Sequence, residues 1–113
     1  MRLTVQGSTI RPTPAIAAHV RRRLAAALGR IRHRVAGVVV TLEDENGPSK
    51  GGVDKSCRLK VALAGMPGGP VIVEQRSDDL YAAIDAASRR AARAVRRSVS
   101  RQRTLRRAPA EKR

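Results

Sequence analysis

The side chains that could perform catalysis or bind a metal ion are few, and their spacing suits neither role. The histidines His19 and His33 have no serine, cysteine or carboxylate at a spacing typical of a catalytic triad. Asp44, Glu45 and Asp54 flank a glycine-rich loop, but they lack the regular alternation of a calcium-binding loop. The sequence therefore predicts a protein that is not an enzyme and that uses no metal ion, no cofactor and no small-molecule substrate.

Cys57 is the single cysteine of the chain, which excludes an internal disulfide and a metal site built from several cysteines. It alternates in phase with Leu59 and Val61, so we expect a small, buried apolar side chain on a strand. The glycine-rich run at 47–52 is not a phosphate-binding loop, because no helix with the required lysine and hydroxyl follows it. Neither feature therefore predicts a chemical step.

The sequence supplies positive charge in large excess. Lysine and arginine number 24 against 9 acidic residues, which gives a formal net charge of +15. Most of these are arginines, whose planar guanidinium binds phosphate oxygens in pairs; the lysines are Lys50, Lys55, Lys60 and Lys112. A GC-rich genome would also enrich arginine over lysine, so this bias alone does not identify RNA. The net charge itself predicts a polyanionic partner.

Aromatic side chains are almost missing, because the chain has no Trp, no Phe and a single tyrosine, Tyr81. This excludes RNA-binding domains that stack bases on aromatic rings of a sheet, and single-strand binders built on aromatic platforms. The core must be aliphatic. We expect binding to involve the nucleic-acid backbone and not the faces of the bases.

Two amphipathic segments carry basic residues along one side. In the segment after Thr13, the exposed side is expected to hold His19 and three arginines. In the segment after Asp78, five arginines lie opposite an apolar stripe, and no acidic residue occurs between Asp85 and Glu111. A solvated surface normally mixes both signs, so we interpret the two sides as ridges that contact RNA phosphates, as in double-stranded-RNA modules. The predicted RNA-binding residues are Arg22, Arg23, Arg30, Arg89, Arg90, Arg93, Arg96 and Arg97.

Four short segments alternate apolar and polar residues with the period of a strand. They cover residues 2–7, 35–43, 57–63 and 71–76. One helix follows the first strand and another follows the last, so the order is β-α-β-β-β-α. We therefore predict a single α+β domain, like a double-stranded-RNA-binding domain, with a right-handed parallel crossover between the first two strands. Two helices are expected to pack on one face of a four-stranded sheet, which leaves the other face open to water.

The ends of both helices have sequence signals. Thr13 supplies an N-cap oxygen and Pro14 a favoured first residue, and Gly29 marks the point where this helix ends or frays. The last helix is expected to be capped by Ser77 or Asp78. Its apolar stripe consists of Leu80, Ile84, Ala87, Ala91, Val95 and Val99.

At 113 residues the chain has room for one domain with a modest core. We expect this domain at residues 1–100. At 101–113, where the apolar period fades, we expect a frayed helix end that passes into a basic and disordered tail. The longest apolar run, residues 35–40, is far shorter than the roughly 20 residues of a membrane span. Residues 2–6 lack an apolar signal core. We therefore expect a cytoplasmic protein with no membrane contact.

The opening of the last helix, Asp79-Leu80-Tyr81-Ala82-Ala83-Ile84-Asp85, resembles the ribosome hibernation-promoting factor family, also called ribosome-associated translation inhibitors. The opening Leu3-Thr4-Val5-Gln6-Gly7, the helix near Thr13 and the order of elements extend this resemblance over residues 1 to about 100. It implies a non-catalytic stress protein, a monomer off the ribosome. Such a protein binds the RNA of the small ribosomal subunit between head and body and silences idle ribosomes by occupying the path of mRNA and tRNA.

The resemblance also implies which residues contact ribosomal RNA. By position, Arg90, Arg93 and Arg97 match basic positions of the family, and Arg22, Arg23 and Arg30 fall on the corresponding side of the first helix. Leu80 and Ile84 match structural positions. Tyr81 is expected to have a packed ring with its hydroxyl near the surface.

Two features depart from the family pattern. The loop at 43–55 is longer and richer in glycine than in common short members, so this corner is expected to contact something different. No second domain of the kind that long members use to pair ribosomes is present, which corresponds to the short form. The charge pattern also fits a general RNA- or DNA-binding protein, such as an RNA chaperone or a nucleoid protein, and this alternative stays open.

Overall fold

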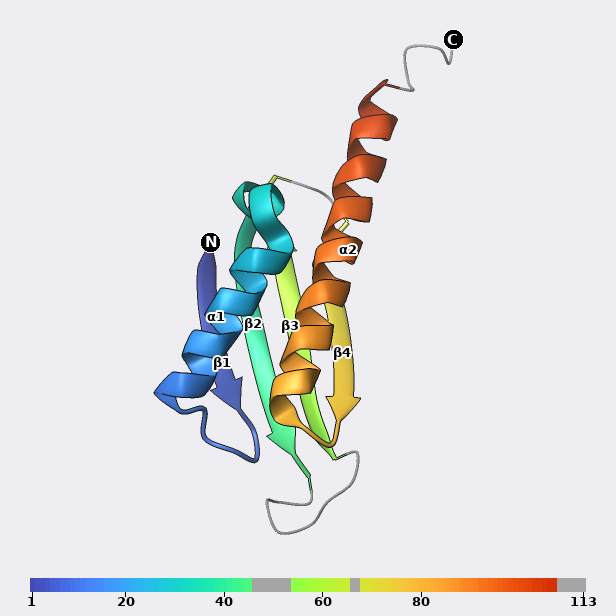
Figure 1. Cartoon of the computed structure of the whole chain (residues 1–113). Helices are drawn as coiled ribbons and strands as arrows, with labels where there is room; N and C mark the ends of the chain where they lie inside the picture. Colours follow the sequence, from blue (N-terminus) through green and yellow to red (C-terminus); the bar gives the residue numbers. More distant parts are fainter. Residues whose placement is uncertain (46–53, 66–67, 108–113) are drawn as a thin grey trace.

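The structure is a computed structural model that describes residues 1–45, 54–65 and 68–107. Its strands form one mixed sheet in the order β1-β2-β3-β4, in which β1 is parallel to β2 and the other neighbours are antiparallel. The predicted β-α-β-β-β-α order is confirmed (Figure 1). The elements are β1 (Arg2–Gly7), α1 (Pro14–Leu28), the short 3-10 helix η1 (Gly29–Arg34), β2 (Val35–Asp44), β3 (Lys55–Leu63), β4 (Val71–Ser77) and α2 (Leu80–Arg107).

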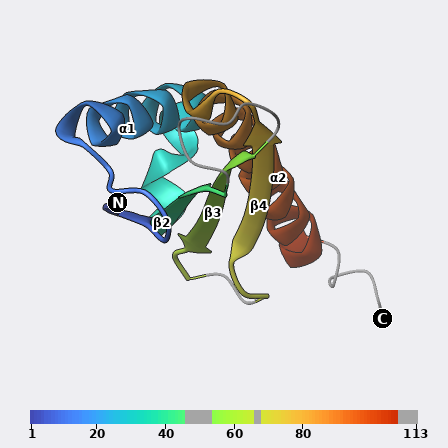
Figure 2. The ribbon, with the colours of Figure 1, turned by 90° about the horizontal axis from the view of Figure 1, so that it is seen from below.

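The molecule has two layers, because α1 and α2 lie side by side on the same face of the sheet (Figure 2). Helix α2 packs against α1, β3 and β4. The predicted α+β arrangement, with both helices on one face, is therefore confirmed. Residues 46–53, which include most of the unusually long loop, lie outside the described residues.

The core between these layers is aliphatic. Alternate residues of the central strands point into it, and the register places Leu42 opposite Cys57 and Val40 opposite Leu59. All four are fully buried, and each leucine buried in this way contributes about 1.5–3 kcal/mol to folding. Cys57 is thus the buried apolar side chain that its phase predicted, and burial raises the pKa of its thiol to about 12.

Helix α1 begins and ends where its sequence signals lie. The Oγ1 atom of Thr13 accepts a hydrogen bond from the N–H of Ile16 at 3.2 Å, and Pro14 is the first helical residue. Gly29 follows the last residue with φ of 55°, a conformation that favours glycine. The chain then tightens into η1, so Arg30 lies on a 3-10 helix and not on the first α-helix as expected.

Helix α2 starts later than its polar residues suggested. Asp79 is the cap, because its Oδ1 accepts the N–H of Tyr81 at 3.1 Å and its carbonyl accepts the N–H of Ala83 at 3.0 Å. The assignment of the cap to Ser77 or Asp78 was wrong. Strand β4 continues through Ser77, whose Oγ instead accepts the N–H of Asp79 at 3.1 Å.

Helix α2 also ends later than expected. It runs to Arg107 and projects beyond the sheet (Figure 1), although Val99 is its last buried apolar residue. Residues 101–107, where we expected a frayed helix end at the start of the basic tail, are therefore helical. Arginine and glutamine are good helix formers, and positive charge at a helix C-terminus is favoured by the dipole. Residues 108–113 lie outside the described residues.

Candidate nucleic-acid interface

Five arginines of α2 form a single exposed surface, which we call the arginine face. Opposite it, Ile84, Ala87, Ala91 and Val95 are fully buried against the sheet. The division of α2 into an apolar and a basic side therefore follows the predicted helical pattern. The arginine face consists of Arg89, Arg90, Arg93, Arg96 and Arg97, all of which are exposed.

Arg93 and Arg97 form the outermost part of this face. They lie four residues apart, one above the other along the helix, and both are exposed. Within the described parts of the chain, neither forms an ion pair or a hydrogen bond. Both guanidinium groups are thus available to an external anion.

Arg90 has a structural partner that its position in the helix did not reveal. Its Nη1 donates to the carbonyl oxygen of Glu74 at 3.2 Å and to Oε1 of Gln75 at 2.8 Å. Both acceptors belong to β4, an edge strand whose outer backbone groups have no further strand to pair with. Arg90 therefore fastens α2 to the edge of the sheet, although it remains exposed.

Arg96 reaches in the opposite direction, toward α1. Its Nη2 donates to the carbonyl oxygen of Ala27 at 2.6 Å. Ala27 lies in the last turn of α1, where backbone carbonyls lack partners within the helix. Arg96 therefore caps the end of α1 and links the two helices.

Asp85 joins the two helices at their other end. Its Oδ1 lies 2.8 Å from Nε2 of His19 and 3.1 Å from Nε of Arg23. The ring of Tyr81 meets His19 edge to face, with ring centroids 4.6 Å apart and planes inclined by 81°. His19 is half-buried in this contact, not on the exposed side of α1 as expected. Tyr81 contacts His19 through its ring but is 40% exposed, so it is less packed than the sequence predicted.

The remaining predicted arginines lie on the first helical segment. Arg22 and Arg23 are exposed on α1, and Arg30 is exposed on η1, beyond the end of α1. Arg22 and Arg30 have no ion pair in the part of the chain that the structure describes. The fold thus brings seven of the eight predicted arginines onto two adjacent helices and places Arg30 at their margin.

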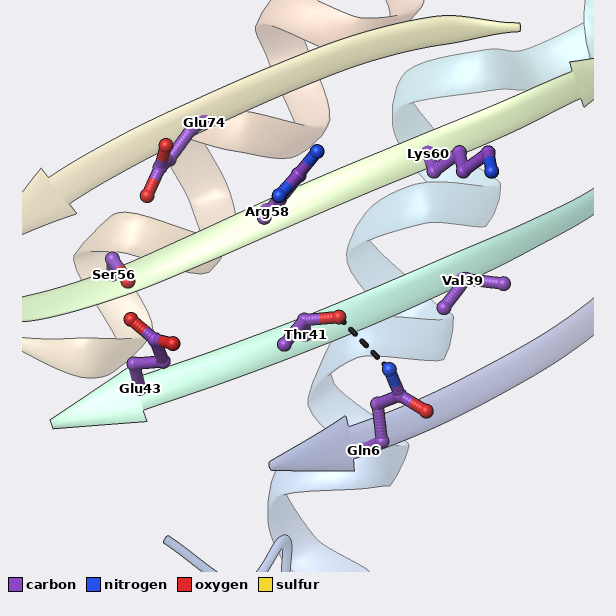
Figure 3. Close-up of a pocket in the computed structure, with 8 residues that line it drawn as sticks. All are labelled: Gln6, Val39, Thr41, Glu43, Ser56, Arg58, Lys60 and Glu74. Atoms are coloured by element: carbon purple, nitrogen blue, oxygen red, sulfur yellow. Dashed lines mark hydrogen bonds between the residues drawn. The ribbon is translucent and has the colours of Figure 1, made fainter. Parts of the chain in front are cut away.

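The open face of the sheet differs from the helices in its charge. It contains a shallow hollow of about 410 Å³. Glu43 and Glu74 balance Arg58 and Lys60 there, and Gln6 donates from Nε2 to Oγ1 of Thr41 at 3.2 Å (Figure 3). A surface with both signs attracts a polyanion less than one with a single sign. The lining residues are Gln6, Val39, Thr41, Glu43, Ser56, Arg58, Lys60 and Glu74.

The acidic residues beside the glycine-rich loop interact with cationic side chains. Lys55 Nζ lies 3.2 Å from Oδ1 of Asp54 and 3.8 Å from Oδ2 of Asp44. Glu45 pairs with Arg76 at 2.9 Å. Burial alone would raise the pKa of Asp54, but the hydrogen bond from Lys55 lowers it overall, and the same bond raises the pKa of Lys55. Lys55 thus supplies positive charge to Asp44 and Asp54, and Arg76 supplies it to Glu45.

These features define a basic α+β domain whose two adjacent helices present arginines to the exterior. The chain belongs to the Ribosomal S30AE family, described as Sigma 54 modulation protein / S30EA ribosomal protein, whose model matches residues 3–103. The resemblance found in the sequence is confirmed. Because this family consists of non-enzymatic ribosome-associated factors, the prediction that the chain is not an enzyme is confirmed as well.

The solved structures that share this fold include two bacterial proteins. A ribosomal subunit interface protein from Coxiella burnetii has a TM-score of 0.74 and 16% identity, covering 88% of this chain and 99% of that chain. The N-terminal domain of Protein Y from Thermus thermophilus has a TM-score of 0.64 and 31% identity, covering 86% and 98%. A search of curated proteins gave no match. Within the described ranges, no helix is long and apolar enough to cross a membrane.

Proposed function

We propose that this chain binds RNA of the small ribosomal subunit through α1 and α2, occupies the path of mRNA and tRNA, and keeps idle ribosomes silent. The observation that carries the proposal is the arginine face, where Arg93 and Arg97 are exposed and have no partner among the described residues. Membership in a family of ribosome-associated factors supports ribosomal RNA as the polyanion.

The chemistry of these helices favours phosphate over other ligands. The planar guanidinium of an arginine can donate two parallel hydrogen bonds to one phosphate group. Asp85 is the single acidic residue of α2, and it is engaged by His19 and Arg23. The helices therefore attract the RNA backbone without an internal competitor at Arg93 and Arg97.

The description of one solved structure with this fold supports a location between the subunits. The Coxiella burnetii protein is described as a ribosomal subunit interface protein. Messenger and transfer RNA pass through that interface, so a protein bound there on the small subunit would exclude them. In this proposal the chain acts in the cytoplasm under stress, as a monomer off the ribosome, through a binding unit formed by residues 1–100.

Sedimentation of a stationary-phase lysate tests this function. The proposal expects the protein to travel with small subunits and whole ribosomes, and purified protein to inhibit translation in a cell-free system. If the protein instead spreads over RNA and DNA without preference for ribosomal particles, it is a general nucleic-acid binder and the proposal is wrong.

A further inference from the structure

A small groove lies between α1 and α2 and has no role in the fold described so far. Its volume is about 170 Å³. Ala26 and Ala27 leave this space because their side chains end at Cβ. The groove is lined by Arg23, Ala26, Ala27, Asp85, Ser88 and Arg89.

Ser88 lines this groove, with its hydroxyl buried beneath the groove surface. The residue is only 2% exposed, and its Oγ has no hydrogen-bond partner in the described structure. A buried hydroxyl without a partner destabilises a protein, so natural proteins rarely keep one without a reason. A rotation of the Ser88 side chain toward the groove would bring this hydroxyl within reach of an acceptor oxygen seated there.

Positive charge flanks the groove on both helices. Arg23 uses Nε to pair with Asp85, and its two terminal nitrogens have no partner within the described ranges. Arg89, across the groove on α2, is exposed and equally unpaired there. The carboxylate of Asp85 also lines the groove, but His19 and Arg23 both contact its Oδ1 and compensate its charge.

We propose that this groove is a seat for one phosphate group of the RNA backbone. Arg23 and Arg89 hold the phosphate from the two helices, and the Ser88 hydroxyl donates to one of its oxygens. Asp85 is a positioning residue that fixes Arg23 through Nε and leaves its terminal nitrogens for the ligand. No aromatic ring lines the groove, so a stacked base is not favoured. The inference rests on the proposed function, because it names the part of the RNA that the helices receive.

Ser88→Ala gives the sharpest test, because its two effects have opposite signs. Removal of the unpartnered hydroxyl raises the melting temperature of the free protein, whereas loss of a phosphate contact lowers affinity for purified small subunits by about 3- to 10-fold. Ser98→Ala is the matched control, since it has the same gain in helix propensity but lies outside the groove. Equal affinities for the two serine variants would overturn the proposal.

A second pair of variants distinguishes contacts made in the groove from the overall electrostatic attraction between protein and RNA. Arg23→Gln with Arg89→Gln should weaken small-subunit binding about 100-fold, at roughly tenfold for each lost charge-assisted contact. Arg2→Gln with Arg58→Gln removes the same charge from the sheet and should weaken small-subunit binding less than about 3-fold. Equal losses in both double variants would mean that the groove is not a seat.

Inorganic phosphate tests the groove without the ribosome. In NMR titrations of the free protein, we expect saturable shifts at the Ser88 and Ala27 amides, and no saturation in the Arg23→Gln, Arg89→Gln variant. Wild-type shifts that stay linear with phosphate concentration overturn the seat even if ribosome binding is intact. Saturable shifts in a protein that does not bind small subunits would support the seat and refute the proposed function.

Discussion

Oδ1 of Asp85 lies 2.8 Å from Nε2 of His19, which joins the only acidic residue of α2 to the neighbouring helix. The arginine face therefore contains no competing anion, and α1 and α2 are fixed side by side at this end. Arg96 fixes them further along through the carbonyl oxygen of Ala27. These contacts hold the two helices in a fixed relative position, so their arginines form one continuous surface.

Replacement of Arg90 by alanine should reduce stability. Its guanidinium bonds to the Glu74 carbonyl and the Gln75 side chain of the edge strand, so we expect a loss of about 0.5–1.5 kcal/mol in the free energy of unfolding. Urea unfolding measures the loss, and amide hydrogen exchange should accelerate in β4. Exposed Arg93→Ala is the control. Equal stability of the two variants would show that the edge contact contributes nothing.

The sequence was sufficient to predict the order of elements, because local patterns determine it. Alternation identified the strands, and the Thr13-Pro14 pair located the start of α1. Local patterns were ambiguous where several neighbouring residues can perform the same capping role. Ser77, Asp78 and Asp79 can each cap a helix, and the end of β4 decides in favour of Asp79.

The candidate site was predicted as a set of arginines but not as a geometry. His19 and Asp85 are 66 residues apart, and no spacing rule links them. The roles of Arg90 and Arg96 likewise depend on contacts 15 to 69 residues away. The one available signal was the position of Asp85 itself, a lone acidic residue before a long run of arginines, which indicated that it had a partner.

Replacement of Cys57 by serine should destabilise the fold and leave binding intact. Cys57 is fully buried, so a hydroxyl without a partner there would cost about 1–3 kcal/mol. Because its pKa is raised to about 12, the native thiol should not react with iodoacetamide at pH 8, whereas the unfolded chain should. Loss of small-subunit binding without any loss of thermal stability would make the thiol a contact residue instead.

Stability should fall in acid through Asp54. Its pKa in the fold lies below 3.8, so the unfolded chain binds the proton more readily. The stabilisation of the fold by ionised Asp54 is complete above about pH 4 and is lost as pH falls through the lowered pKa. Unfolding free energy measured from pH 7 to pH 2 should therefore decrease more steeply for the wild type than for Asp54→Asn. Parallel curves would show that the Lys55 contact does not stabilise the fold.

Binding to small subunits should weaken strongly with salt. Contact with six to ten phosphates releases counterions and predicts a loss of about 10³ to 10⁵ in affinity between 50 and 200 mM salt, by analogy with duplex DNA. Titrations at several salt concentrations measure the slope. A flat response would contradict contacts with the RNA backbone.

The most direct test of the RNA-binding face is charge reversal at Arg93 and Arg97, which have no partner in the described structure. Arg93→Glu with Arg97→Glu should leave the fold intact, because both residues are exposed and arginine and glutamate have similar helix propensities. Reversal of Arg58 and Lys60 to glutamate is the control, since it makes the same charge change on the open face of the sheet.

The measurement is the affinity of both variants for purified small subunits, together with inhibition of cell-free translation. The helix variant should bind about 10² to 10⁴-fold more weakly and should no longer inhibit, because two charge-assisted contacts of about 1.5–3 kcal/mol each are lost. The sheet variant should lose affinity only because the protein's overall positive potential is reduced. If the helix variant still silences translation while the sheet variant fails, the bare sheet is the RNA-binding surface and the arginine face is not.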